Sequence, residues 1–196
     1  KGFVVEGGPM RVILKSPELA NLGVPGAITN PAITVHNLAN ATIATNDDWQ
    51  TGPSSAEIAG SSFASGLTTQ AAAVIVDLQP GTYTASLTSQ GGGSGTGFLE
   101  VYPFVDTNQS RLINSSGRGT VGANSFIEGI IISGTTPKKI LIRARGADSL
   151  AGLGISNGLP DPVITVYDTG NGNAVLTTVD NWEQDARANE VKLTAH

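Results

Sequence analysis

The 196-residue chain contains no cysteine, which excludes a disulfide framework and a thiolate metal site. Charged residues make up only 14% of the chain, against about 25% in a typical globular protein. The net charge is −5, which argues against nucleic acid as a partner because phosphates require clustered lysine and arginine. No apolar run approaches the roughly 18 residues that span a bilayer, so we expect no membrane insertion.

What the chain does contain is 25 glycines and a hydrophobic fraction of 39%. This composition suits short strands joined by tight turns, and it is common among extracellular β proteins. We therefore expect a secreted or cell-surface protein. The chain begins with Lys1 rather than Met, which leaves open a cleaved leader or an excerpt of a longer protein.

The sequence contains about one and a half copies of one module. The copies are offset by roughly 130 residues, a period far longer than that of a solenoid repeat. Residues 10–15 (MRVILK) and 138–143 (KKILIR) each place aliphatic residues between charges, after a proline and an apolar stretch that ends in glycine. Three other pairs of segments match in the same order along the chain: 3–7 with 130–134, 30–37 with 161–168, and 46–49 with 179–182.

The coarse pattern predicts an all-β fold, an antiparallel β-sandwich of the jelly-roll or immunoglobulin-like kind. Each module has roughly seven to eight short apolar runs separated by glycine and proline turns. Residues 73–78 and 82–88, joined by a Gln-Pro-Gly turn, are predicted to pair as a β-hairpin.

We predict a β-sandwich module over residues 1–108, which a strand from 111–128 would complete, and an incomplete second copy over 109–196. The second copy has no counterpart of residues 73–102. A half-sandwich leaves an apolar face and unpaired strand edges. Two interpretations remain open: another subunit supplies the missing strands, or the sequence is an excerpt of a tandem array.

The first interpretation predicts a non-enzymatic structural protein that polymerises with itself into a filament or surface array by strand complementation. The residues expected to carry assembly lie at the incomplete edges of the two copies. They are Phe3, Val4 and Val5 at one end, and Val163, Ile164, Val166, Val175 and Leu176 at the other.

The repeated stretches resemble the tandem β-sandwich repeats of large secreted and surface proteins of environmental bacteria. The resemblance lies in residues 129–144, 161–168, 46–49, 80–85 and 97–102. Residues 42–102 are also similar to the bacterial pre-peptidase C-terminal domain, a jelly-roll accessory module of secreted enzymes. These resemblances imply a location outside the cell and a modular role, without a catalytic activity.

Acidic loops offer an alternative function as an accessory module that binds calcium or carbohydrate. Carboxylates are the ligands that Ca²⁺ prefers, and the accessory-domain resemblance points to Asp47 and Asp48. The full set of candidate ligands is Asp47, Asp48 and Glu57 in the first copy and Asp180, Asp185 and Glu190 in the second. Side chains that cap turns explain the same residues, and no cofactor is otherwise required.

Trp49 and Trp182 follow these loops, and an exposed indole would stack on a sugar ring of a cell-surface glycan. The competing interpretation is that each tryptophan plugs the end of a sandwich. For catalysis the inventory is thin, because no histidine recurs between the copies and no Gly-x-Ser-x-Gly motif is present. The sequence therefore predicts that the protein is not an enzyme.

Overall fold

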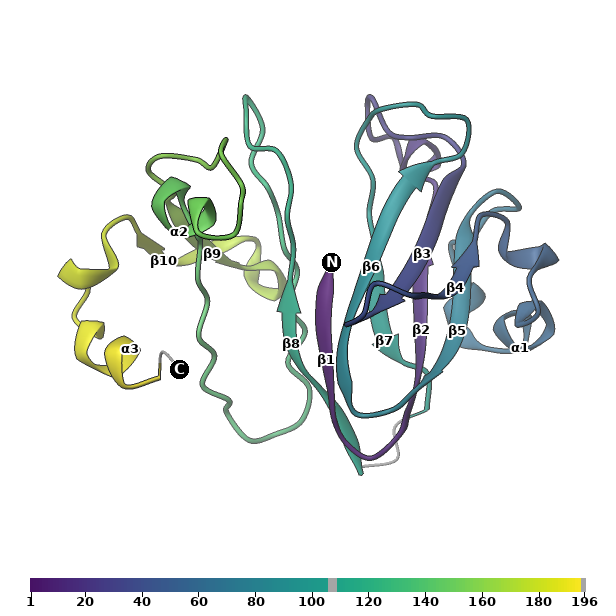
Figure 1. Cartoon of the computed structure of the whole chain (residues 1–196), viewed down its shortest axis with the longest axis horizontal. Coiled ribbons are helices and arrows are strands. Elements are labelled where there is room, and N and C mark those ends of the chain that lie inside the picture. The colour runs from purple at the N-terminus through teal and green to yellow at the C-terminus, as the bar shows by residue number, and fades with distance from the viewer. Residues whose placement is uncertain (106–108, 195–196) are drawn as a thin grey trace. The chain divides into compact units, whose positions relative to one another are not determined.

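The computed structural model describes residues 1–105 and 109–194 and divides the chain into two compact units, Lys1–Gly119 and Thr120–His196 (Figure 1). Residue 108, at the predicted module boundary, lies outside the described residues. The strand that follows this boundary belongs to the first unit, because it pairs with the N-terminal strand. Each unit is described below by itself.

The first unit is an antiparallel β-sandwich, as the sequence predicts. Its larger sheet has the strand order β4-β3-β6-β1-β8, and its smaller sheet has the order β5-β2-β7. The strands are β1 (Gly2–Gly7), β2 (Met10–Ser16), β3 (Pro31–Asn37), β4 (Thr42–Asn46), β5 (Ala72–Leu78), β6 (Gly81–Ser89), β7 (Glu100–Pro103) and β8 (Ser110–Ser116).

The core lies between the two sheets. Val12 and Leu14 of β2 face Phe3 of β1 and Val35 of β3, and all four are buried. Burying an aliphatic or aromatic side chain of this size contributes about 1.5–3 kcal/mol. Buried positions alternate along β1 and β3, so the period-two pattern of the sequence fixes which face of these two strands is buried.

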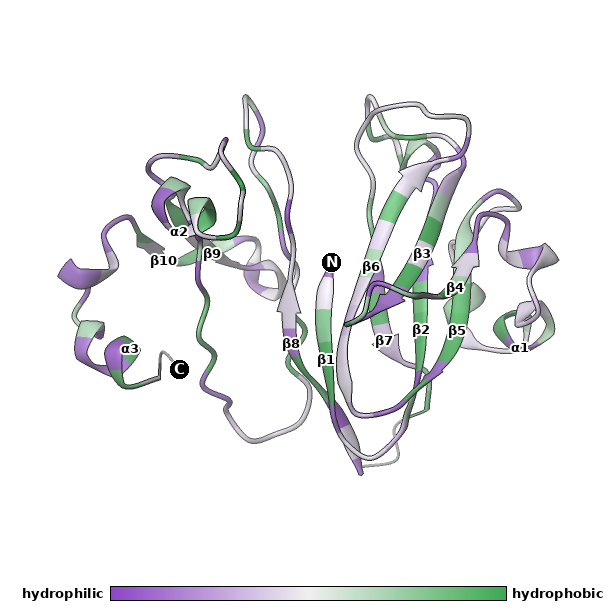
Figure 2. Ribbon diagram, viewed as in Figure 1, coloured by the Kyte–Doolittle hydropathy of each residue, from purple (hydrophilic) through white to green (hydrophobic). Residues whose placement is uncertain are grey.

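The outer face of the smaller sheet is covered as well. Ile13 of β2 and Ile75 of β5 pack beneath Trp49 and Ile58, which lie on the short helices η2 (Trp49–Thr51) and α1 (Ser55–Ala59). Because both faces are covered, β2 and β5 are apolar along most of their length, as Figure 2 shows. Two further short helices in this unit are η1 (Leu19–Leu22) and η3 (Ser62–Ala64).

The predicted hairpin of residues 73–78 and 82–88 is wrong. Both segments are strands, but β5 pairs with β2 in the smaller sheet, whereas β6 pairs with β1 and β3 in the larger one. The Gln79-Pro80 turn therefore crosses from one sheet to the other. Alternating apolar residues specify a strand and its buried face, but they do not specify its partner.

The prediction that residues 3–6 form an incomplete edge also requires correction. β1 is flanked by β6 on one side and β8 on the other, so its backbone is already paired along both edges. Phe3 and Val5 are buried in the core and Val4 is half-buried. The edges of the larger sheet are β4 and β8.

Asn46 joins the two sheets, and its replacement tests this junction. Its Oδ1 accepts a hydrogen bond of 3.0 Å from the Ala73 amide of β5, and its Nδ2 donates to the Asp48 carbonyl at 3.2 Å. We expect Asn46→Ala to lower the free energy of unfolding by about 1–3 kcal/mol, because the buried amide loses its acceptor. Urea unfolding measures this loss, and Thr42→Ala, on the exposed part of the same strand, should stay within about 0.5 kcal/mol of wild type.

Tyr102 gives the first unit a pH dependence in the alkaline range. Burial, together with the hydrogen bond of 2.6 Å that its hydroxyl donates to Glu100, raises the pKa of Tyr102 to about 12 from an ordinary value of 10.0. Since the folded state disfavours the phenolate, this contribution to stability is complete below pH 10 and is lost between pH 10 and about 12. Urea unfolding at several pH values should show wild type losing stability relative to Tyr102→Phe across that window, and parallel curves would contradict the assignment.

The second unit contains one two-stranded sheet among its described residues. It is formed by β9 (Ile164–Asp168) and β10 (Ala174–Val179). Its helical segments are α2 (Ala147–Ala151), η4 (Thr169–Asn171), η5 (Trp182–Gln184) and α3 (Ala188–Thr194). Throughout the part of the chain that the structure describes, the helices fall short of the length and apolarity that a membrane crossing requires.

Candidate assembly surface

The hairpin of the second unit repeats the strand pairing of a hairpin of the first. Ile33 faces Asn46 across β3 and β4, and Ile164 faces Val179 across β9 and β10. The register shifts at the matching place in both hairpins, after Val35 in one and opposite Val166 in the other. A pair of threonine hydroxyls joins the strands in each, Thr34 with Thr45 at 3.4 Å and Thr165 with Thr178 at 3.2 Å.

An ion pair also recurs. In the first unit Arg11 of β2 binds Glu57 of α1 at 2.7 Å, and in the second unit Lys139 binds Glu190 of α3. Glu57 lies as far after Trp49 as Glu190 lies after Trp182. Lys139 therefore holds its segment to α3 as Arg11 holds β2 to α1.

The segments that correspond to β1 and β2 nevertheless remain unpaired in the second unit. Residues 130–132 and 138–143 have no regular secondary structure, although the sequence predicts strands there. In the first unit β2 is flanked by β5 and β7, and β6 separates β1 from β3. The described residues of the second unit contain no counterpart of β5, β6 or β7, so these segments lack the neighbours whose hydrogen bonds define a strand.

The corresponding side chains differ sharply in exposure. Ile13 of β2 is 0% exposed, whereas Leu141 is 42% exposed. Val12 and Leu14, also fully buried, correspond to Ile140 and Ile142, which are 42% and 41% exposed. The same aliphatic positions are thus a core in one unit and a surface in the other.

The counterparts of β1 follow the same rule. Phe3 and Val5 are buried, and their counterparts Ile130 and Ile132 are about half exposed. Of the residues that the sequence predicted for assembly here, Val163, Val175 and Leu176 are exposed, and Ile164 and Val166 are half-buried. We call residues 130–132, 140–142, 163, 175 and 176 the open face.

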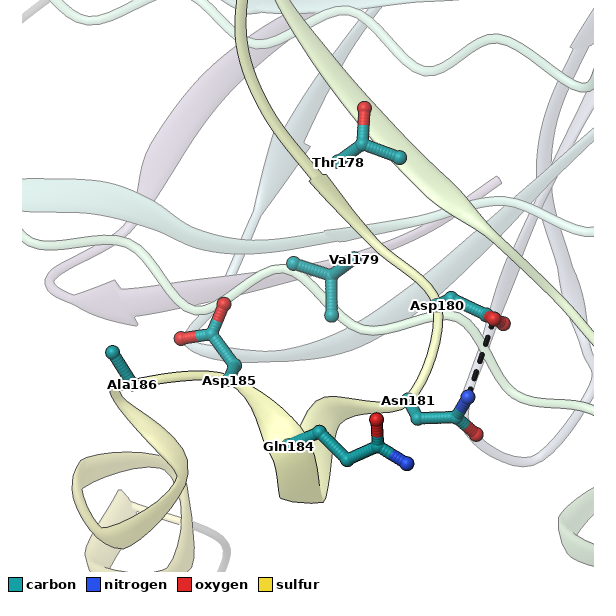
Figure 3. Close-up of a pocket in the computed structure, with 7 residues that line it drawn as sticks. All are labelled: Thr178, Val179, Asp180, Asn181, Gln184, Asp185 and Ala186. Atoms are coloured by element: carbon teal, nitrogen blue, oxygen red, sulfur yellow. Dashed lines mark hydrogen bonds between the residues drawn. The ribbon is translucent and has the colours of Figure 1, made fainter.

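An open depression next to β10 lies where a strand is missing. It is lined by Thr178, Val179, Asp180, Asn181, Gln184, Asp185 and Ala186 (Figure 3). In the first unit, residues at the corresponding positions bind β5 and the residue before it: Asn46 accepts from the Ala73 amide, and the Trp49 amide donates to the Ala71 carbonyl. Among the described residues, no carbonyl accepts from the Trp182 amide. Val179 takes the place of Asn46 and cannot repeat its side-chain bond. By position, the depression lies where β5 begins in the first unit.

The predicted calcium ligands are largely engaged with protein partners. Asp47 accepts hydrogen bonds from Gln90 and from the Asp48 amide, whereas Glu57 and Glu190 form the recurring ion pairs. Within residues 1–105 and 109–194, no three or more acidic, histidine or cysteine side chains gather as a metal site would require. One oxygen of Asp48 is buried without a hydrogen-bond partner. Calcium binding at Asp47 and Asp48 stays a prediction, for which the melting temperature with added Ca²⁺ is the measurement.

The acidic residues of the second copy lie apart from one another. In Figure 3 the carboxylates of Asp180 and Asp185 lie on opposite sides of the depression. Asp180 accepts a hydrogen bond from Asn181. Asp185 binds Arg187, and the hydrogen bonds from Arg187 hold the pKa of the Asp185 carboxyl below its ordinary value.

The two tryptophans have different surroundings. Trp49 is 7% exposed, and its indole donates a hydrogen bond of 2.7 Å to the Thr68 carbonyl. It therefore plugs the outer core and has no free ring face for a sugar. Trp182 is 43% exposed, with the Lys192 ammonium 5.8 Å from its ring centre. The described residues of the second unit place no strand beneath it as β5 lies beneath Trp49.

Sequence reasoning missed residues 130–132 and 140–142 as part of the exposed surface. The sequence repeat could have revealed them, because it aligns these residues with β1 and β2, whose partner strands have no second copy.

No family model, curated protein or solved structure matches the chain. Fold and surface together define an antiparallel β-sandwich protein with a second unit whose apolar segments are uncovered.

Proposed function

We propose that this chain is a non-enzymatic structural protein of an extended extracellular assembly, in which strands of a neighbouring module complete the second unit. The exposure of Ile140, Leu141 and Ile142, at positions that are fully buried in the first unit, supports this proposal most directly. An apolar face with unpaired backbone is an unstable surface for an isolated chain and a suitable one for strand addition.

The energetics favour a firm junction. Covering about 1,000 Å² of apolar surface contributes on the order of 25 kcal/mol before the costs of ordering and association. Main-chain hydrogen bonds from the added strands satisfy donors and acceptors that water otherwise solvates. A junction of this kind separates slowly, as a structural assembly requires.

Counting strands limits how the assembly forms. The described residues carry one set of β5, β6 and β7 but two sets of segments that need them. Donating this set to a neighbour would open the donor's own first unit, with no net gain in paired strands. In a homopolymer of this chain, the open face of one subunit therefore packs against the open face of another. In a tandem array, a further module supplies the missing counterparts of β5, β6 and β7.

The location outside the cell rests on composition and resemblance. The low charge, the absence of cysteine and the abundant glycine fit a secreted β protein. The tandem repeats that the sequence resembles are found in large secreted and surface proteins, a resemblance that implies a location outside the cell and a modular role.

Sedimentation velocity and negative-stain electron microscopy of the purified chain test the proposal together. We expect oligomers or filaments of the 20.0 kDa subunit whose population rises with protein concentration. A chain that stays monomeric at high concentration, with residues 130–143 protected from hydrogen exchange, would overturn the proposal because the open face would then be covered within one chain.

A further inference from the structure

The second unit retains the two cations of β2, but its described residues lack the carboxylates that β5 and β7 place beside those cations in the first unit. In the first unit Lys15 of β2 faces Glu100 of β7 in the strand register, with the ammonium 3.4 Å from the carboxylate. Both side chains are only 15% exposed. At the other end of β2, Arg11 faces Asp77 of β5 at 3.6 Å. Charges of opposite sign thus flank β2 at its two ends, one on each neighbouring strand.

Arg143 and Lys139 take the places of Lys15 and Arg11 in the second unit. Lys139 keeps the carboxylate of α3, Glu190, which matches Glu57. Arg143 is exposed and forms no ion pair within the described residues. The carboxylates that are missing are those that β5 and β7 provide in the first unit.

We infer that the second unit selects an incoming strand of the β7 type, an apolar strand with a glutamate that faces Arg143 as Glu100 faces Lys15. This inference rests on the proposed function and names the partner: a strand with the pattern Glu-Val-Tyr-Pro, supplied by another module of this kind. Arg143 is its specificity-determining residue.

Burial makes the charge selective. Once a strand covers this edge, Arg143 becomes largely buried, as Lys15 is in the first unit. A cation that loses water without gaining a carboxylate carries a large desolvation cost, and a cation facing another cation is repelled in addition. Apolar strands without an acid at this position would therefore bind poorly, although they cover the same aliphatic side chains.

The positions of the charges also set the direction in which an incoming strand runs along segment 138–143. The acid of the β7-type strand meets the C-terminal end of segment 138–143, and the acid of a β5-type strand meets its N-terminal end. A strand that arrives in the opposite direction places its carboxylate at the wrong end. Charge thus fixes the orientation of a junction that apolar contacts alone would leave undefined.

The test uses the full chain, diluted below its association range, and a fluorescent synthetic peptide of residues 98–105. Fluorescence anisotropy compares the wild-type peptide with its Glu100→Lys form, on the wild-type chain and on Arg143→Glu. We expect Arg143→Glu to bind the wild-type peptide about tenfold more weakly or worse and to recover affinity for the Glu100→Lys peptide. Lys138→Glu is the matched control and should bind the wild-type peptide as the wild-type chain does. It makes the same charge change at the residue that matches Met10, which lies on the opposite face of β2 from Lys15.

Each outcome distinguishes the inference from the proposed function. Equal binding of both peptides by both chains would overturn the selection by charge and leave strand completion in place. If no peptide binds while the chain still assembles, the partner strand is of another type and the inference fails alone. If the peptides do not bind and the chain never associates, both fail.

Discussion

Leu141→Asp is expected to abolish self-association of the chain while the first unit stays folded. Leu141 is 42% exposed in the single chain, so an aspartate there remains hydrated until a partner covers it. Covering an unpaired carboxylate costs several kcal/mol, so the association constant should fall by a factor of at least about 100. Sedimentation velocity over a range of concentrations measures this change.

Two variants control for general effects of the new charge. Leu153→Asp places the same charge at a leucine that is 59% exposed outside the open face, and it should associate as wild type does. Ile13→Asp makes the equivalent change in the first unit, where the side chain is fully buried, and should unfold that unit. Unchanged association of Leu141→Asp would exclude the open face as the junction.

Leu14→Ala should lower the free energy of unfolding by about 2–5 kcal/mol, whereas Ile142→Ala in the monomeric chain should lower it by less than about 1 kcal/mol. The two positions match in the repeat, but Leu14 is 0% exposed and Ile142 is 41% exposed. Truncation leaves a cavity only where neighbouring atoms surround the side chain. Urea unfolding with tryptophan fluorescence, at concentrations where the chain is monomeric, gives both values.

The same pair of variants reports on assembly when the concentration is raised. Joining of two open faces would bury Ile142, so the cost of Ile142→Ala should then approach that of Leu14→Ala. A large loss from Ile142→Ala in the monomer would mean that residues of the same chain already cover this side chain.

Much of the fold could be predicted from local residue patterns. Alternating apolar residues locate the strands, and the repeat aligns β9 with β3 down to the paired threonines. The ion pairs of Arg11 and Lys139 were also within reach, because their partners follow the two tryptophans at the same distance. The sequence instead suggested calcium ligands, since a carboxylate pattern does not distinguish a metal from a nearby cation.

Strand pairing could not be predicted in the same way. The sequence predicted that a strand from 111–128 completes the first module, but it did not predict that this strand, β8, pairs with β1, which was expected at an incomplete edge. The turn after Leu78 leads to the other sheet instead of back along β5. Both outcomes depend on contacts between distant segments, which local patterns do not encode.

The pairing of β1 with β8 has a mechanical consequence. Gly2 faces Ser116 at one end of this antiparallel pair, and Gly7 faces Ser110 at the other. Tension applied through Lys1 and Gly119 therefore pulls apart two neighbouring strand ends, so the hydrogen bonds break one after another rather than together. β8 would peel away first, while β1 stays held by β6. A load applied through these two points would therefore lengthen the first unit gradually, as β8 is released one hydrogen bond at a time.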